Sequence, residues 1–272
     1  MLNLLTHFLG GLGLFLLGMW LMTDGLKLAA GQALERILGA WTSTRLRGLL
    51  SGMLLTTLVQ SSSAVTVAVI GFANAGILTF AQTMWVIFGS NVGTTMTGWL
   101  VAVIGFNLRI EAFALPAIGV GMLLRLTGEG SRRGAYGLAL AGFGALFLGI
   151  DVLMYAFAGI GDRITLDAWA DAGPAGWPIY VAIGLVLTVL MQSSSAALAV
   201  ALTAAAGGVL PLTPAAALVV GVNVGTTVKA LLATIGATPN ARRAAAAHVI
   251  FNVLTAAAAL QLQAPLLAAI RR

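Results

Sequence analysis

Charged side chains are scarce in this chain of 272 residues: only 8% are Asp, Glu, Lys or Arg, against about 25% in a typical soluble domain. So few charges cannot cover a surface that faces water, and 60% of the residues are hydrophobic. Several apolar stretches reach about 18 residues or more, the length that a helix needs to cross a bilayer. These features exclude an ordinary soluble domain. They predict an all-α integral membrane protein that contacts the lipid bilayer.

Cysteine is absent altogether, which excludes disulfides and every reaction that needs a thiol. The 14 basic residues outnumber the eight acidic ones. In a membrane protein such an excess is typical of cytoplasmic loops, so we expect no nucleic-acid partner. The sequence shows no carboxylate pair, no metal-ligand cluster and no serine beside a base. We therefore expect neither an enzyme nor a cofactor.

Two polar motifs each occur twice. The tetrapeptide Gln-Ser-Ser-Ser occupies residues 60–63 and again residues 192–195, which lie 132 positions later. The heptapeptide Gly-x-Asn-Val-Gly-Thr-Thr occupies residues 89–95 and 221–227, at the same offset. Chance does not explain two long motifs in one register. The chain is therefore predicted to be a duplication, with repeats of residues 1–130 and 131–272.

Each repeat has five segments in the same order: an apolar span, a more polar connector, the Gln-Ser-Ser-Ser stretch, the Asn-Val-Gly-Thr-Thr stretch and a closing span. In the first repeat these segments are residues 4–25, 26–47, 48–76, 80–104 and 111–126. In the second repeat they are residues 134–157, 158–176, 177–208, 211–235 and 244–268.

The Gln-Ser-Ser-Ser stretch is too long to cross the membrane as one upright helix. As a single helix, residues 48–76 would be about 43 Å long, against a hydrocarbon core of about 30 Å. The polar tetrapeptide lies near the middle of the stretch. This pattern favours a re-entrant hairpin of two half-length helices. One long, tilted helix with a serine patch is the alternative.

With three spans and one hairpin per repeat, the odd number of crossings inverts the second repeat relative to the first. If residues 26–47 lie inside, nine basic residues fall on the cytoplasmic side and four on the outside. If the serine stretches crossed the membrane, the split would be eight against five. The charges favour two inverted-topology repeats, in which the hairpin tips enter from opposite sides and can meet near the membrane midplane.

The hairpin tips carry serines and no carboxylate. A broken helix leaves free backbone N–H groups at the start of its second half, and these groups and the helix dipole favour an anion. Together with the serine hydroxyls, two facing tips can surround a small tetrahedral oxyanion. The candidate residues for this anion are Gln60, Ser61, Ser62, Ser63, Gln192, Ser193, Ser194 and Ser195.

The Asn-Val-Gly-Thr-Thr stretches suit a cation. Their glycines allow local unwinding, and freed carbonyls together with neutral side-chain oxygens are the ligands that sodium prefers in transporters. Hydrogen bonding between helices by small polar residues is the alternative. The candidate sodium ligands in these stretches are Asn91, Thr94, Thr95, Asn223, Thr226 and Thr227.

The paired motifs resemble those of the sodium-dependent phosphate cotransporter family, the type II sodium–phosphate cotransporters and their bacterial relatives. The resemblance covers nearly the whole chain, and residues 247–252 also fit it. It implies inorganic phosphate as substrate and sodium as the driving ion. It also implies that both ligands bind at the hairpin tips, which adds Gln60, Ser61, Gln192 and Ser193 to the candidate sodium ligands. Many bacterial relatives carry a PhoU-like regulatory domain, which we do not expect here.

Lys229 lies two residues beyond Thr227, inside a predicted span, where the first repeat has Thr97. A charge at membrane depth is costly and indicates a functional residue. We group Lys229 with the phosphate-binding residues, because its ammonium group can neutralise the substrate. Two alternatives stay open: the ammonium group takes the place of one sodium ion, or the side chain extends to the cytoplasmic edge of the membrane.

The sequence thus predicts a secondary active transporter of inorganic phosphate in the inner cell membrane, coupled to sodium and working by alternating access. A passive channel or exporter of phosphate with weak or no sodium coupling is the alternative. The direction of transport, the selectivity against arsenate or sulfate, the sodium stoichiometry and a homo-oligomeric state stay open. We expect His248 to be structural, as an intramembrane hydrogen-bond donor near Asn252; a role in proton coupling is the alternative.

Overall fold

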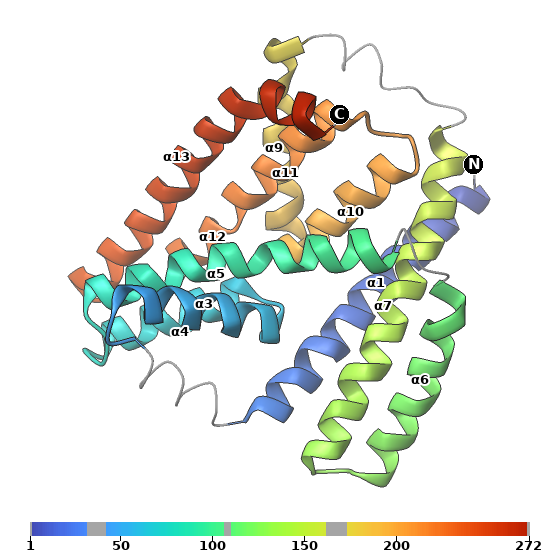
Figure 1. Ribbon diagram of the computed structural model, residues 1–272, viewed down its shortest axis with the longest axis horizontal. Helices are drawn as coiled ribbons and strands as arrows, with labels where there is room; N and C mark the ends of the chain where they lie inside the picture. The colour runs from blue at the N-terminus through green and yellow to red at the C-terminus, as the bar shows by residue number, and fades with distance from the viewer. Residues whose placement is uncertain (1, 32–41, 106–109, 162–172, 271–272) are drawn as a thin grey trace.

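The computed structural model describes residues 2–31, 42–105, 110–161 and 173–270, and every regular element in these ranges is helical (Figure 1). The prediction of an all-α protein is confirmed for this part of the chain. Part of each predicted connector, residues 32–41 in the first and 162–172 in the second, lies outside the described residues.

The helices of the two halves follow the same order. The first half contains α1 (Leu2–Ala30), α3 (Arg45–Val59), α4 (Ser62–Asn74), α5 (Phe80–Leu100), a π-helical turn (Val101–Gly105) and α6 (Ile110–Thr127). The second half contains α7 (Arg132–Gly161), a 3-10 turn (Gly173–Gly176), α9 (Trp177–Met191), α10 (Ser194–Ala206), α11 (Leu212–Gly225), α12 (Thr227–Leu232) and α13 (Pro239–Ile270). Helices α3, α4 and α5 begin 132 positions before α9, α10 and α11, respectively.

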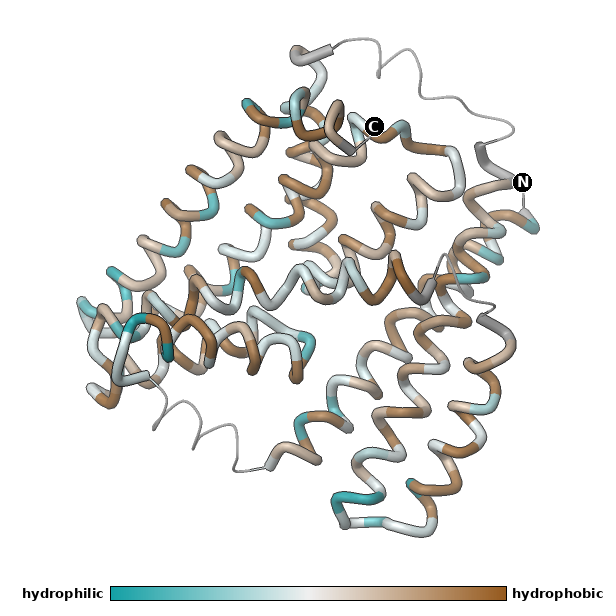
Figure 2. Tube along the Cα trace, in the orientation of Figure 1, coloured by the Kyte–Doolittle hydropathy of each residue, from teal (hydrophilic) through white to brown (hydrophobic). Residues whose placement is uncertain are grey.

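Five of the described helices are long and apolar enough to cross a membrane, which supports a multi-pass membrane protein. The sixth predicted span, residues 111–126, falls on the shorter helix α6. Figure 2 shows hydrophobic residues along most of α6 and α7, with hydrophilic residues at the loop that joins them. Large apolar side chains such as Leu123, Leu190 and Ile235 are exposed on the protein surface, as expected where the solvent is lipid.

The Gln-Ser-Ser-Ser stretches are helical hairpins. In the first, α3 and α4 are separated by a break at Gln60 and Ser61. A side-chain carbon on Gly48, at the start of α3, would touch Trp85, near the start of α5. The chain therefore returns through α4 to the end from which α3 began. The alternative of one long helix is wrong, because the backbone turns left-handed at Gln60.

The hairpins pack on the following helices through pairs of glycines. A Cβ atom on Gly52 of α3 would collide with the backbone carbonyl of Val86, and one on Gly89 of α5 with that of Leu49. In the second half, Gly184 of α9 and Gly221 of α11 meet in the same way. Only glycine allows the helix backbones to approach this closely, so these pairs fix each hairpin against its neighbour.

Helices α1 and α7, which are equivalent in the two halves, run antiparallel. Gly11 of α1 faces Leu153 of α7, while Gly25, near the other end of α1, faces Ala139. Phe15 and Phe147 belong to the large apolar cluster between these helices and the second hairpin. Equivalent helices of opposite direction are what an inverted duplication requires, although the orientation of the whole repeats stays a prediction.

Candidate functional site

Each hairpin turns at a glutamine in the left-handed region. Gln60 and Gln192 both have φ of 53°, and they are the only non-glycine residues with positive φ among the described residues. This conformation costs about 1–2 kcal/mol. Each side-chain amide compensates by donating from Nε2 to the carbonyl three residues earlier, Thr57 or Val189, at 2.6 Å. The glutamine therefore closes the carboxyl end of the first hairpin helix.

The serine after each glutamine begins the second hairpin helix. Ser61 Oγ accepts a hydrogen bond from the Ala64 N–H, and Ser193 Oγ accepts one from the Ala196 N–H, both at 3.2 Å. This is the usual pairing of an N-cap serine. Apart from the N–H group that the N-cap serine binds, the first N–H groups of α4 and α10 have no partner within their own helices. They can therefore bind an anion in front of the turn.

The two motifs contact each other through Thr97 of α5. Thr97 Oγ1 donates to Gln60 Oε1 at 2.9 Å and lies 3.3 Å from Ser195 Oγ, which itself donates to the Gln60 carbonyl at 3.5 Å. All three side chains are buried. The side-chain amide and the carbonyl of Gln60 are thus engaged by protein groups, and this contact joins the two halves of the protein.

A small pocket lies between the tips. We call it the serine pocket, and its polar lining includes Ser63, Gln192, Ser193, Ser194, Thr226 and Lys229. Ser63 comes from the first motif and the other serines from the second, so both halves contribute hydroxyl groups. Neighbouring Ser62 is buried, and its Oγ has no hydrogen-bond partner among the described residues.

The two Asn-Val-Gly-Thr-Thr motifs face a second, larger pocket. We call it the Asn-Thr pocket, and its polar lining comprises Asn91, Thr94, Thr95, Ser194, Asn223, Thr226 and Thr255. Ser194 and Thr226 line both pockets, which are therefore adjacent. Thr227 does not line this pocket: it is buried, and its Oγ1 donates to the Val224 carbonyl at 2.8 Å.

Threonine hydroxyls in the Asn-Thr pocket already donate their hydrogens to backbone carbonyls, so their oxygens can act only as acceptors. Thr94 Oγ1 donates to the Ser90 carbonyl at 3.0 Å, Thr95 Oγ1 to that of Val92 at 2.7 Å, and Thr226 Oγ1 to that of Asn223 at 2.6 Å. A carbonyl can only accept, so each hydroxyl has used its single hydrogen. The remaining lone pairs suit a cation and cannot donate to an anion.

Unwinding at the heptapeptides occurs in one half only. Helix α11 ends at Gly225, and the Thr226 N–H bonds to the Asn223 carbonyl before α12 begins. In the first half, the expected unwinding is wrong, because α5 continues through Gly93 to Leu100. Gly93 instead serves packing, since a Cβ atom there would lie 2.8 Å from Thr56 Cβ. The irregularity comes later, in the π-helical turn.

Lys229 lies in α12, directly after this break. Its ammonium group donates a hydrogen bond to the backbone carbonyl of Gln192, at the second hairpin turn. Its side chain is half-buried and lines the serine pocket. Lys229 therefore contacts the second turn, as its counterpart Thr97 contacts the first. Lys229 is charged and reaches the backbone oxygen of Gln192, whereas Thr97 is neutral and reaches the side-chain oxygen of Gln60.

Two threonines outside the motifs, Thr56 and Thr188, help to hold the hairpins against the following helices, and the sequence alone did not assign them a role. Thr56 Oγ1 lies 2.6 Å from Ser90 Oγ, which donates to the Ser62 carbonyl at 3.4 Å. Thr188 Oγ1 donates to the Val222 carbonyl at 3.2 Å. The signal was present, because Thr56 and Thr188 are themselves separated by the repeat offset of 132.

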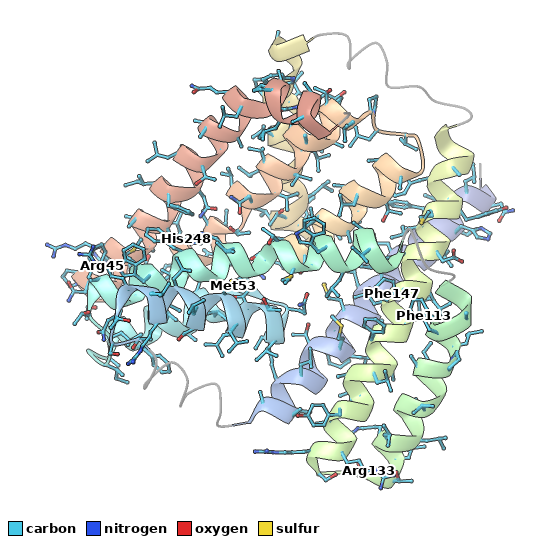
Figure 3. All side chains as sticks on the ribbon, viewed as in Figure 1. Arg45, Met53, Phe113, Arg133, Phe147 and His248 are labelled. Atoms are coloured by element: carbon cyan, nitrogen blue, oxygen red, sulfur yellow. The ribbon has the colours of Figure 1, made fainter. Side chains whose placement is uncertain are left out.

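His248 is almost completely buried on α13, which packs against α5 and α4 (Figure 3). Both ring nitrogens lack a hydrogen-bond partner among the described residues. Asn252 Nδ2 donates to the backbone carbonyl of His248 at 2.9 Å, and its own Oδ1 is unpaired in the same part of the chain. The expected hydrogen-bond donation by the His248 ring is therefore wrong: only the His248 backbone contacts Asn252.

Comparisons with known proteins agree with the geometry. A sequence model of the family described as "Na+/Pi-cotransporter" matches residues 14–154 and 177–269. YqeW of Bacillus subtilis, an uncharacterized protein, is 34% identical over 90% of this chain and 78% of its own length. No solved structure matches the chain.

Two further relatives have names that describe a function. YjbB of Escherichia coli, whose name gives it as a candidate inorganic phosphate exporter, is 27% identical over 92% of this chain. The sodium-dependent phosphate transport protein 2A of Rattus norvegicus is 35% identical over 38% of this chain. The chain spans 45% of the length of YjbB and the match 16% of that of the rat protein. These relatives are transporters and not enzymes.

Proposed function

Because the chain belongs to the Na+/Pi-cotransporter family, we propose that it is a secondary active transporter that moves inorganic phosphate across the inner cell membrane, driven by sodium. The observation that carries this proposal is the serine pocket. It combines hydroxyl groups from two hairpin tips, each of which begins a helix, and a nearby ammonium group. Its lining contains no carboxylate, which would repel an anion.

Phosphate binds between the tips in this proposal. Ser63 from the first motif and Ser194 from the second provide hydroxyl donors, and Ser193 provides one when it gives up its weak bond to Met19 Sδ. The starts of α4 and α10 provide backbone N–H groups. Ser62 has an unpaired, buried hydroxyl beside them. Hydrogen bonds to a charged group contribute about 1.5–3 kcal/mol each, net of the hydration that both groups lose, so a few such donors favour binding of the anion.

Sodium binds next to the phosphate, in the Asn-Thr pocket and at the hairpin turns. The threonine lone pairs that point away from the helix carbonyls are suitable ligands, and Asn91 and Asn223 add amide oxygens. The proposed ligand set also includes Gln60, Ser61, Gln192 and Ser193 at the turns. The two pockets share Ser194 and Thr226, so a cation and an anion bound in them would attract each other.

Transport proceeds by alternating access between two inverted repeats, residues 1–130 and 131–272. Supporting observations are the matching helix order, the antiparallel packing of α1 on α7, and the contact between Gln60, Thr97 and Ser195. That contact lies between the halves, so a relative movement of the halves must break or remake it. Inverted repeats that rock around a central site are a common transporter design.

A passive phosphate channel or exporter is the second candidate, and it is favoured by the name of the relative YjbB. Flux of labelled phosphate in proteoliposomes separates the two. A coupled transporter accumulates phosphate against its gradient when a sodium gradient is imposed, and potassium does not replace sodium. Downhill flux that is indifferent to sodium contradicts the coupled proposal.

The same assay tests the serine pocket. Ser62→Ala and Ser194→Ala each remove one donor and should reduce phosphate uptake by about tenfold or more, since about 1.4 kcal/mol corresponds to a factor of ten. Thr127→Ala is the control, because its exposed hydroxyl bonds only within α6. Normal uptake in both serine variants contradicts the site.

A further inference from the structure

We propose that the Lys229 ammonium group is a permanent cation at the second hairpin turn, so that this half of the protein binds one sodium ion fewer than the first half. The inference rests on the proposed sodium-coupled transport of phosphate and concerns its stoichiometry. It selects one of the alternatives that the sequence leaves open for this lysine, and it takes Gln192 and Ser193 out of the proposed set of sodium ligands.

The carbonyl that Lys229 contacts is the kind of ligand that a metal cation uses in a broken helix. Helix α9 ends at Met191, and Gln192 adopts the left-handed conformation, so the Gln192 carbonyl is outside the regular helix. The carboxyl end of a helix also carries partial negative charge. Freed carbonyls and helix C-termini coordinate sodium in transporters, and here the Lys229 ammonium group binds that carbonyl.

The first half shows the same position without a charge. Thr97 lies 132 positions before Lys229 and donates its hydroxyl hydrogen to the side-chain oxygen of Gln60. A hydroxyl group cannot supply the positive charge that an anion beside the turn needs. In this proposal a sodium ion supplies that charge at the first turn, whereas Lys229 already supplies it at the second.

The position of Lys229 in the fold explains why its side chain reaches the turn. Helix α11 stops at Gly225, and the short helix α12 carries Lys229 into the lining of the serine pocket. Lys229 lines this pocket together with Ser63 and Ser193, which come from opposite halves. The alternative of extension to the membrane edge does not fit, because the ammonium group bonds to the hairpin backbone.

The test compares sodium binding and sodium coupling in the full chain. In detergent, equilibrium binding of radioactive sodium counts the ions per chain. In proteoliposomes, the dependence of phosphate uptake on sodium concentration gives the Hill coefficient. Lys229→Thr restores the residue of the first half and should bind one more sodium ion, with a Hill coefficient higher by about one. Thr97→Lys should show the opposite change, with one ion fewer.

Lys229→Met is the matched control, because it removes the charge without adding an oxygen ligand. It should lose phosphate uptake by about tenfold or more and gain no sodium ion. If Lys229→Thr instead weakens phosphate binding with an unchanged sodium count, Lys229 is a phosphate ligand and the proposal is wrong. If the count and the phosphate affinity are both unchanged, the proposal is also wrong.

The outcomes separate this inference from the proposed function. If wild-type protein shows no sodium-dependent phosphate flux, the proposed function fails, while the sodium count of wild type against Lys229→Thr still decides the role of Lys229. If Lys229→Thr does not fold, as judged by size-exclusion chromatography, the reciprocal Thr97→Lys variant decides, and an unchanged sodium count there overturns the proposal.

Discussion

At the scale of single residues, the two hairpin turns share a backbone and differ in their surroundings. Gln60 and Gln192 have the same left-handed conformation and the same side-chain bond to the preceding turn. Gln60 is buried and also accepts from Thr97 and Ser195, whereas Gln192 is exposed and accepts from Lys229. Identical motifs therefore serve different purposes: the first turn joins the halves, and the second presents its carbonyl to a cation.

This difference predicts unequal effects of the same substitution. Gln60→Ala should lower stability by about 2 kcal/mol or more, because it leaves buried partners unpaired. Gln192→Ala should cost only about 1 kcal/mol. Both alanines carry the same backbone strain, so the pair isolates the contribution of burial. Thermal unfolding of the purified variants in detergent measures the difference in stability. Equal losses of stability would contradict the proposed contact between the two halves at Gln60.

At the scale of helices, glycine pairs determine how each hairpin meets its neighbour. The contacts of Gly52 with Val86 and of Gly221 with Val181 leave no room for a methyl group. The sequence shows these glycines as repeated positions, but their role follows only from the packed helices. The expectation that the heptapeptide glycines unwind both helices is wrong in α5, because there Gly93 packs against Thr56 of α3.

Substitution of these glycines tests the packing. Gly52→Ala and Gly221→Ala should each lower stability by about 1–3 kcal/mol, the usual cost of overpacking. Gly71→Ala in α4 is the matched control, because a Cβ atom there meets nothing within 4 Å. It should be neutral or stabilising by up to about 1 kcal/mol, as expected for alanine in a helix. Thermal unfolding in detergent is the measurement; three indistinguishable variants would argue against close helix contact.

At the scale of the whole molecule, the antiparallel packing of α1 on α7 gives physical support to the inverted duplication. If the repeats are inverted, the two hairpins start on opposite sides of the membrane. Arg45 is exposed at the start of α3, and Ala175 is exposed just before α9, so both positions are accessible to labelling.

The absence of cysteine makes this arrangement directly testable. With single cysteines at these sites, Ala175→Cys should react with a membrane-impermeant maleimide in intact cells, and Arg45→Cys should react only after the membrane is permeabilised. Unmodified, cysteine-free protein is the control for background labelling. Reaction of both variants from the same side would contradict inverted repeats.

The sequence by itself indicated the lipid surroundings, the duplication and the break at each Gln-Ser-Ser-Ser stretch. These three features follow from hydropathy, internal repeats and helix length, which can be read along the chain without knowing its tertiary contacts. The sequence also identified most of the polar residues that line the two pockets. Only the tertiary structure showed that Ser63 faces the second motif, that Thr97 joins Gln60 to Ser195, and that Lys229 reaches the Gln192 carbonyl. These contacts connect residues far apart in sequence, and the packing of hairpins on glycine-paired helices decides which of them form.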